Sequence, residues 1–167
     1  MYLIIGDRLE HLSLSYNGGK DCLVLLILIL ACLPELVSSQ ISSRGDAQST
    51  SEMTVPEHGA LSKPLQAIYI VSQDPFPEVE EFVASSAAQY HLDLDRYALP
   101  MREALDAYLN DKTEIKAIFM GTRRTDPHSD TLGHFSPTDQ GWPQFMRINP
   151  VIDWHYADIW AVSYRTV

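Results

Sequence analysis

Hydrophobic residues fall into short runs and longer segments in alternation along the chain, which predicts strands that alternate with helices. Segments of strand length occupy residues 12–15, 67–71, 96–99 and 115–120, and segments of helical length occupy 22–33, 78–90 and 101–109. We therefore predict an α/β fold with a doubly wound, mostly parallel sheet flanked by helices and joined by right-handed crossovers.

The pattern stops between Pro34 and Lys63, where Ser, Thr, Gln and Gly are dense and no helical or strand period persists. A polar, aperiodic segment of this length is too long for an ordinary connection, so we predict a disordered insertion at 34–63. The chain has 167 residues and 46% hydrophobic content, enough for one real core. We expect a single domain over 1–167, interrupted by this insertion.

Charge and cysteine content narrow the functional class. A net charge of −10 argues against nucleic acid as a partner, which would require a basic face. The apolar run 22–33 is shorter than the roughly 20 residues of a membrane span. Cys22 and Cys32 lie on one predicted helix, and neither they nor the scattered histidines show zinc-ligand spacing. We expect a monomeric cytoplasmic protein with no targeting segment and no membrane partner.

The residues Ser-Tyr-Asn-Gly-Gly-Lys-Asp at 15–21 join the first predicted strand to the first predicted helix. Two glycines permit a tight turn, and the free N–H groups and dipole of a helix start favour an anion. Lys20 adds a positive charge, and Asn17 and Asp21 offer oxygen ligands for Mg²⁺ beside a phosphate. A glycine turn before a core helix is the simpler interpretation, but the polar residues around the glycines favour a phosphate loop.

Two further polar segments follow predicted strands. Arg123 and Arg124 are adjacent at the carboxyl end of the fourth strand, where two guanidinium groups suggest a shared anion, a solvated turn being the alternative. Asp126 can fix one arginine or accept from a ligand N–H. Asp74 follows the second strand, at the edge where ligands bind in open α/β sheets, and is either a ligand or a turn carboxylate.

The segment 15–21 resembles the pyrophosphate-binding loop of the adenosine-nucleotide α-hydrolase superfamily. Gly-Thr-Arg-Arg-Thr-Asp-Pro at 121–127, with the later segments 135–139, 142–143, 145–150 and 153–160, closely resembles the eukaryotic FAD synthase (FMN adenylyltransferase) domain, in the PAPS-reductase-like branch of that superfamily. The resemblance runs from about Leu12 to Trp160, apart from the insertion, and 121–127 is its most specific part.

The resemblance implies transfer of the AMP part of MgATP to FMN, which gives FAD and pyrophosphate. It implies that the enzyme supplies no covalent nucleophile and acts by positioning and charge neutralisation. By matching positions, it assigns ATP binding to Ser15, Asn17, Gly18, Gly19, Lys20, Asp21 and Asp74, Mg²⁺ contact to Asn17 and Asp21, and catalysis to Asn17, Lys20, Asp21 and Arg124. It assigns the flavin side to Gly121, Arg123, Arg124, Asp126, Asp139, Trp142 and Trp154, although large aromatic residues are also frequent in cores.

Two alternatives remain at this point. The family continues after Trp160 through another helix and a segment that completes the flavin site, whereas this chain has only residues 161–167, so a truncated, non-catalytic nucleotide- or flavin-binding protein is one alternative. A PAPS reductase is the other, but its chemistry requires a nucleophilic cysteine in a C-terminal tail. No cysteine follows Cys32, which disfavours that enzyme.

Overall fold

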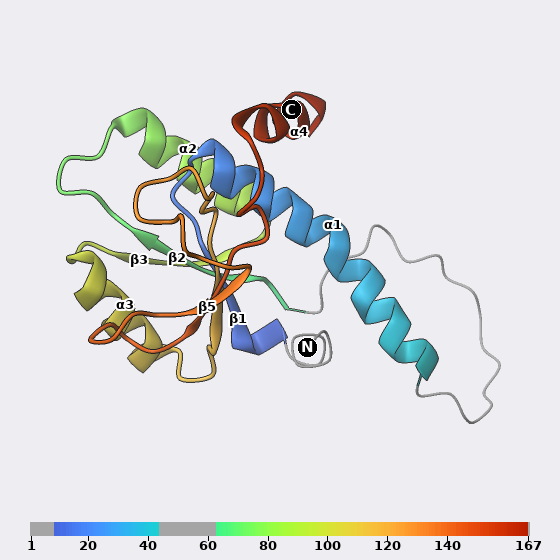
Figure 1. The fold of residues 1–167 in the computed structure, drawn as a ribbon, viewed down its shortest axis with the longest axis horizontal. Coiled ribbons are helices and arrows are strands. Elements are labelled where there is room, and N and C mark those ends of the chain that lie inside the picture. The colour runs from blue at the N-terminus through green and yellow to red at the C-terminus, as the bar shows by residue number, and fades with distance from the viewer. Residues whose placement is uncertain (1–8, 44–62, 167) are drawn as a thin grey trace.

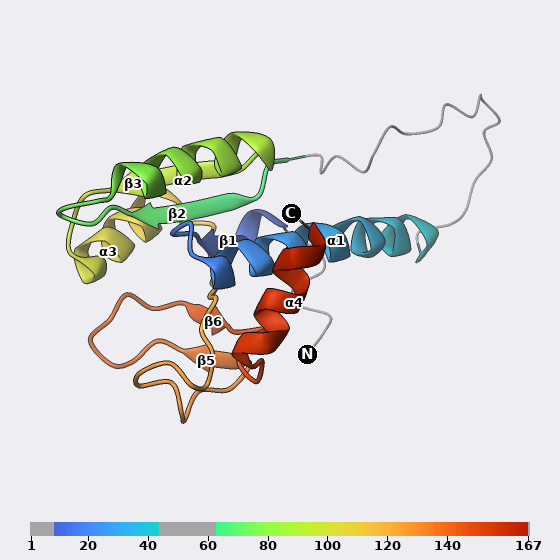
Figure 2. The same cartoon turned by 90° about the horizontal axis from the view of Figure 1, so that it is seen from above.

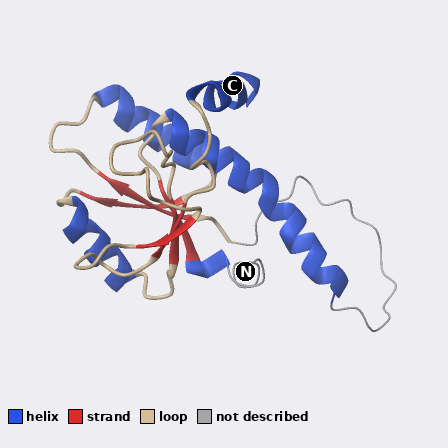
Figure 3. Cartoon of the chain, viewed as in Figure 1, coloured by secondary structure: helices blue, strands red, loops and turns tan. Residues whose placement is uncertain are grey.

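The computed structural model describes residues 9–43 and 63–166. Within them, a six-stranded sheet has the order β3-β2-β1-β4-β6-β5 (Figures 1 and 3). Its strands are β1 Leu12–Ser15, β2 Gln66–Ile70, β3 Asp93–Tyr97, β4 Ala117–Phe119, β5 Phe135–Pro137 and β6 Met146–Ile148. All neighbours pair in parallel except β5, which is antiparallel to β6. The predicted doubly wound, mostly parallel α/β sheet is confirmed.

Four helices accompany the sheet in the described residues: α1 Lys20–Ser43, α2 Pro77–Gln89, α3 Met101–Asp111 and α4 Tyr156–Thr166, with a short 3-10 turn at Leu9–His11 before β1. Helices α1 and α2 cover one face of the sheet, where Leu14, Ala67 and Tyr69 are buried against them. Helix α3 covers the other face, over Ile68 and Ile118. Figures 1 and 2 show that α4 packs beside α1, on the side away from α3.

The third predicted strand is displaced. We predicted 96–99, but β3 begins at Asp93 and ends at Tyr97, paired with β2 from Gln66 to Ile70. A search for hydrophobic runs does not detect this strand, because three of its five residues are charged. These charges are tolerated because β3 lies at the edge of the sheet. Strands β5 and β6 and helix α4 were not predicted as elements, and each strand is only three residues long.

The boundary of the predicted insertion is wrong at its beginning. Helix α1 continues beyond Pro34 to Ser43, because a proline inside a helix removes one N–H donor without necessarily ending the helix. Residues 44–62 of the predicted insertion lie outside the described residues. In the described part of the chain, none of the helices combines the length and the apolar character needed to cross a bilayer.

The order of the strands determines which loops meet. The chain runs from β1 outward to β2 and β3, then returns to place β4 on the other side of β1. Strands β1 and β4 are parallel neighbours, with Leu12 opposite Ala117 and Leu14 opposite Phe119. The loops that follow these two strands therefore leave the same edge of the sheet side by side.

Candidate functional site

The loop after β1 depends on its first glycine. Gly18 has a φ of 71°, in the left-handed region that favours glycine. A Cβ added there would lie 2.8 Å from Cγ2 of Val83, so helix α2 packs directly against the loop. Both the backbone conformation and the close approach require glycine at this position.

Asn17 fixes the entry into α1. Its Oδ1 accepts a hydrogen bond of 2.9 Å from the N–H of Gly19, and the carbonyl of Gly19 accepts from the N–H of Leu23. The side chain of Asn17 thus satisfies one donor just before the first turn of the helix. The following N–H groups, at the start of a 24-residue helix, point toward the carboxyl edge of the sheet.

The loop after β4, residues 121–133, packs against the start of α1. A Cβ added at Gly121 would lie 3.1 Å from both the backbone N and the Sγ of Cys22. Cys22 is buried, and its burial raises the pKa of the thiol to about 11. Only glycine allows the two loops to approach so closely without displacement of the helix.

Four charged side chains link the two loops. Both carboxylate oxygens of Asp21 face cations: Oδ2 lies 2.7 Å from Nζ of Lys20, and Oδ1 lies 2.9 Å from Nε of Arg123. Asp126 accepts from the backbone N–H of Arg123 at 2.8 Å and from its Nη2 at 3.4 Å. The side chain of Arg123 is 12% exposed. The cluster therefore pairs two cations with two carboxylates at the edge between β1 and β4.

The pair between Asp21 and Arg123 is an ion pair without hydrogen-bond alignment. Oδ1 of Asp21 and Nε of Arg123 are both shielded from solvent and have no hydrogen-bond partner. The contact between these two residues is therefore electrostatic rather than a hydrogen bond.

Arg124 points elsewhere. Its Nε and Nη2 each lie 2.7 Å from Oδ1 of Asp153, and its Nη1 donates to the carbonyls of Asp130 and Leu132 at 3.1 and 2.8 Å. The structure therefore joins Arg124 to the segment after β6 and to its own loop. Sequence reasoning placed both arginines on the flavin side and assigned catalysis to Arg124, but of the two only Arg123 contacts the phosphate loop.

The remaining predicted residues are dispersed. Asp74 is exposed between β2 and α2. Trp154 packs against the buried cluster of Val24, Val151 and Ile159, which favours a core role. Asp139 lies 3.4 Å from Nη2 of Arg147.

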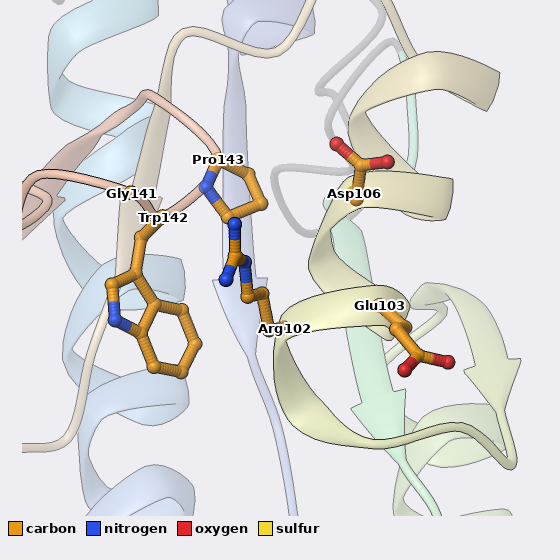
Figure 4. Close-up of a pocket in the computed structure, with 6 residues that line it drawn as sticks. All are labelled: Arg102, Glu103, Asp106, Gly141, Trp142 and Pro143. Atoms are coloured by element: carbon orange, nitrogen blue, oxygen red, sulfur yellow. The ribbon is translucent and has the colours of Figure 1, made fainter.

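Trp142 lies beside α3, in a group separate from the charged cluster. It is 38% exposed and lines a cavity of about 490 Å³ with Arg102, Glu103, Asp106, Gly141 and Pro143 (Figure 4). The structure therefore brings together Lys20, Asp21, Arg123 and Asp126, and places Trp142 at a separate cavity.

Sequence reasoning missed Tyr156, whose ring centroid lies 5.3 Å from Nζ of Lys20. It also missed Asp153 and Arg147 as the partners of Arg124 and Asp139. The sequence carries one local sign of this region, an aspartate three residues after His155 at the start of α4. In the structure, the backbone N–H of His155 donates to Asp158, as in a capped helix start. That signal predicts a helix there but not what lies beside it.

Comparison with known proteins gives a consistent result. The family model described as the phosphoadenosine phosphosulfate reductase domain matches residues 11–104 and 96–166. A probable FAD synthase from Schizosaccharomyces pombe is 37% identical over 157 residues, which are 94% of this chain and 53% of that protein. The flavin adenine dinucleotide synthase of Saccharomyces cerevisiae is 32% identical over 157 residues, 90% of this chain and 49% of that protein.

A solved structure agrees in fold and sequence. The FMN adenylyltransferase of Candida glabrata, crystallised with FMN and the ATP analogue AMPCPP, superimposes with a TM-score of 0.76 at 34% identity, covering 92% of this chain and 47% of that one. This chain spans about half the length of each of these three relatives. The resemblance to FAD synthases is confirmed, and the chain belongs to the phosphoadenosine phosphosulfate reductase domain family.

Proposed function

We propose that this chain is an FMN adenylyltransferase domain that transfers AMP from MgATP to FMN and releases FAD and pyrophosphate. The observation that carries the proposal is the contact between the two loops at the β1–β4 edge, made by the ion pair of Asp21 and Arg123. This edge is the topological switch point, where open α/β sheets bind ligands. FMN and an ATP analogue are the ligands named for the Candida glabrata relative.

In the proposed reaction, an oxygen of the FMN phosphate attacks the α-phosphorus of ATP. A new P–O bond forms, the bond from the α-phosphorus to the bridging oxygen breaks, and pyrophosphate leaves with that electron pair. The protein contributes position and charge rather than a nucleophile. Lys20 and the first N–H groups of α1 would hold the β and γ phosphates, supported by the turn that Ser15, Asn17, Gly18 and Gly19 form.

Arg123 would neutralise negative charge on the phosphates where ATP, the AMP donor, meets FMN, the acceptor. It is the only arginine of the adjacent pair that reaches the phosphate loop, and Asp126 holds it from the other side. We assign Arg124 to the support of the loop after β4, residues 121–133, here called the arginine loop. Three nitrogens of Arg124 already contact Asp153 and backbone carbonyls.

The flavin ring needs an apolar, partly enclosed surface. Trp142 is the better candidate of the two tryptophans, since it is accessible and lines a cavity whose volume is in the range of small-molecule sites, about 300 to 1,000 Å³. Trp142 and Pro143 supply the apolar part of this cavity, and charged side chains line the rest: Arg102, Glu103 and Asp106. Asp139, which pairs with Arg147 and precedes Trp142 in the same segment, is a candidate to accept from a ring N–H. We keep Gly121 as a flavin-side residue because its backbone closely approaches Cys22 at the start of α1. Asp74 remains a candidate residue for ATP binding.

Mg²⁺ fits this site only in part. The described residues contain no group of three or more His, Cys, Asp or Glu side chains that could hold a metal. Asp21 and Asn17 supply a carboxylate and an amide oxygen, and Mg²⁺ often takes its other ligands from phosphates and water. We propose that these two residues contact a Mg²⁺ that arrives with ATP and neutralises phosphate charge.

The proposal is tested by incubation of the purified chain with FMN and MgATP, with FAD measured by chromatography and pyrophosphate by a coupled assay. We expect FAD and pyrophosphate in equal amounts, and no pyrophosphate without FMN. Lys20→Ala should lower the rate about tenfold or more, because it removes a charge-assisted contact. Lys116→Ala, which removes an exposed lysine just before β4, is the matched control.

Three results would contradict the proposal. MgATP binding without FAD formation would favour the non-catalytic nucleotide-binding protein. FAD formation that Lys20→Ala leaves unchanged would contradict the phosphate loop as the ATP site. Pyrophosphate release that does not depend on FMN would indicate another acceptor.

A further inference from the structure

The first residues of α1 and α4, Lys20 and Tyr156, are in contact although 136 positions separate them in the sequence. Helix α4 packs on α1 through Val24 and Ile159, both fully buried, together with Val151. Trp154 packs against the same cluster. The position of α4 relative to the phosphate loop is therefore fixed by an apolar contact, about one helical turn from Lys20.

The start of α4 is also defined locally. The backbone N–H of His155 donates to Oδ2 of Asp158 at 2.8 Å, and the N–H groups of Asp158 and Ile159 both lie within hydrogen-bonding distance of the carbonyl of His155. This arrangement is that of a helix capped at its first turn. Tyr156, the first residue of α4, is thus held at a fixed backbone position.

Tyr156 uses this position to contact Lys20. The Nζ of Lys20 lies 5.3 Å from the centroid of the Tyr156 ring, within the range of a cation–π interaction. The same Nζ lies 2.7 Å from Oδ2 of Asp21. The ammonium group therefore has an aromatic contact and a carboxylate contact.

These two contacts differ in their consequences for a phosphate. The carboxylate of Asp21 cancels the charge of Lys20 and is shared with Arg123 at 2.9 Å. An aromatic ring attracts a cation through its quadrupole and has no net charge, so it restricts the ammonium without neutralising it. A flexible four-carbon side chain that is already restricted loses less freedom when it binds an anion.

We propose that Tyr156 is a positioning residue for Lys20, which holds the ammonium at the phosphate loop and thereby strengthens the binding of the pyrophosphate part of MgATP. The proposal rests on the proposed function in one respect, namely that Lys20 binds phosphate. The contact between the two residues is independent of any ligand.

Three variants of the full chain separate this role from a structural one. Tyr156→Leu removes the ring and keeps an apolar side chain, whereas Tyr156→Phe keeps the ring face. Tyr164→Leu is the matched control: Tyr156 and Tyr164 each contact the ring of Trp160, at 5.9 and 5.3 Å between centroids, so both leucine variants deprive Trp160 of one aromatic neighbour. Only Tyr156→Leu also removes the contact with Lys20.

The first measurement needs no ligand. The protons next to Nζ of Lys20, observed by NMR with labelled lysine and assigned with Lys20→Ala, should be shifted upfield by the ring current of Tyr156. Tyr156→Leu should abolish the shift, and Tyr156→Phe and Tyr164→Leu should keep it. A lysine signal that Tyr156→Leu leaves unchanged would show that the contact does not exist in solution and would overturn the proposal.

The second measurement is calorimetric titration with MgATP and, separately, with magnesium pyrophosphate. Tyr156→Leu should weaken both affinities about two- to fivefold, the effect of an exposed cation–π contact. Tyr156→Phe and Tyr164→Leu should bind as the unchanged chain does. In the Lys20→Ala background, Tyr156→Leu should cause no further loss, because the residue acts through Lys20.

The outcomes are distinguishable from failure of the proposed function. If Tyr156→Leu lowers the affinity equally in the unchanged chain and in Lys20→Ala, the residue acts through α4 itself. If Tyr156→Leu and Tyr156→Phe have equal affinities, the aromatic ring has no role. Either result overturns the positioning role while MgATP binding stands. If the unchanged chain binds neither MgATP nor pyrophosphate, the proposed function fails and the positioning role fails with it.

Discussion

The Nε atom of Arg123 lies 2.9 Å from Oδ1 of Asp21, and this ion pair joins the loop after β4 to the first turn of α1. The two side chains are 12% and 20% exposed, so water screens their attraction only in part. The pair is consequently part of the stability of this edge as well as of its proposed chemistry.

We expect Arg123→Met to lower the free energy of unfolding by about 1 to 3 kcal/mol, because it leaves a shielded carboxylate oxygen without its cation. Urea unfolding at neutral pH measures the change. Lys63→Met is the control, since its pair with Glu10 has side chains that are 71% and 44% exposed. Loss of such an exposed pair should cost less than about 1 kcal/mol.

A double-mutant cycle refines this test. Asp21→Asn in the Arg123→Met background removes a carboxylate that has already lost one of its two cations and keeps only Lys20, so the double variant should be more stable than the sum of the two single changes predicts. Strict additivity of the two changes would contradict the ion pair as a stabilising contact.

Gly18→Ala should destabilise the phosphate loop. The φ of 71° costs an alanine about 1 kcal/mol, and its Cβ would lie 2.8 Å from Cγ2 of Val83. We expect a loss of about 1 to 3 kcal/mol in urea unfolding, combining the backbone and packing terms. Gly133→Ala is the control, because the nearest atom to its Cβ would be 3.7 Å away.

Val83→Ala separates the two causes. In the Gly18→Ala background it relieves the clash but not the backbone strain, so it should cost less than it does in the unchanged chain. If Gly18→Ala is as harmless as Gly133→Ala, the loop does not have the conformation described here.

Stability should fall at alkaline pH. Burial raises the pKa of Cys22 from 9.0 to about 11 and that of Tyr108 from 10.0 to about 12. The folded protein therefore keeps these protons more tightly than the unfolded chain. Their stabilising contribution is complete below about pH 9 and is lost as the pH rises through the folded values. Cys22 alone should account for about 1.4 kcal/mol of loss between pH 8 and pH 10.

Urea unfolding at pH 8 and pH 10 measures this loss. Cys22→Ala should reduce the difference between the two pH values, whatever it does to stability at pH 8. Cys32→Ala, at an exposed position of the same helix, should leave the difference unchanged. An unreduced difference in Cys22→Ala would mean that the thiol is not the group that titrates.

The part of the site that lies within one segment could be predicted from the sequence. The loop from Ser15 to Asp21 combines a strand, two glycines and a helix start, and its geometry depends mainly on those residues. The alternation of β1, β2 and β4 with helices also determines the α/β class. These features are local in the sequence, so a hydrophobic pattern and turn chemistry are sufficient.

The contacts between segments could not be predicted. Arg123 reaches Asp21 because β4 lies beside β1, an adjacency fixed by the strand order. The different roles of Arg123 and Arg124 depend on Asp153, which follows a three-residue strand with no recognisable pattern. Tyr156 contacts Lys20 only because α4 packs on α1.

Arg124 provides the last prediction. Its guanidinium group contacts Asp153 and the carbonyls of Asp130 and Leu132, so it ties the arginine loop to the segment after β6. Arg124→Ala should loosen that loop and weaken FMN binding more than MgATP binding, as measured by quenching of flavin fluorescence and by calorimetry. If the effect passes through the loop, Asp153→Ala should give the same pattern at a smaller size, because the two carbonyl contacts remain.

Arg96→Ala is the matched control, since Arg96 also pairs with a carboxylate, Glu80, but lies on the edge strand β3. It should change neither affinity. A loss of FMN binding in Arg124→Ala with unchanged binding in Asp153→Ala would place the guanidinium on the ligand itself, as the sequence alone suggested. A loss of MgATP binding only would contradict the assignment of the arginine loop to the acceptor, because the loop would then serve the phosphate donor.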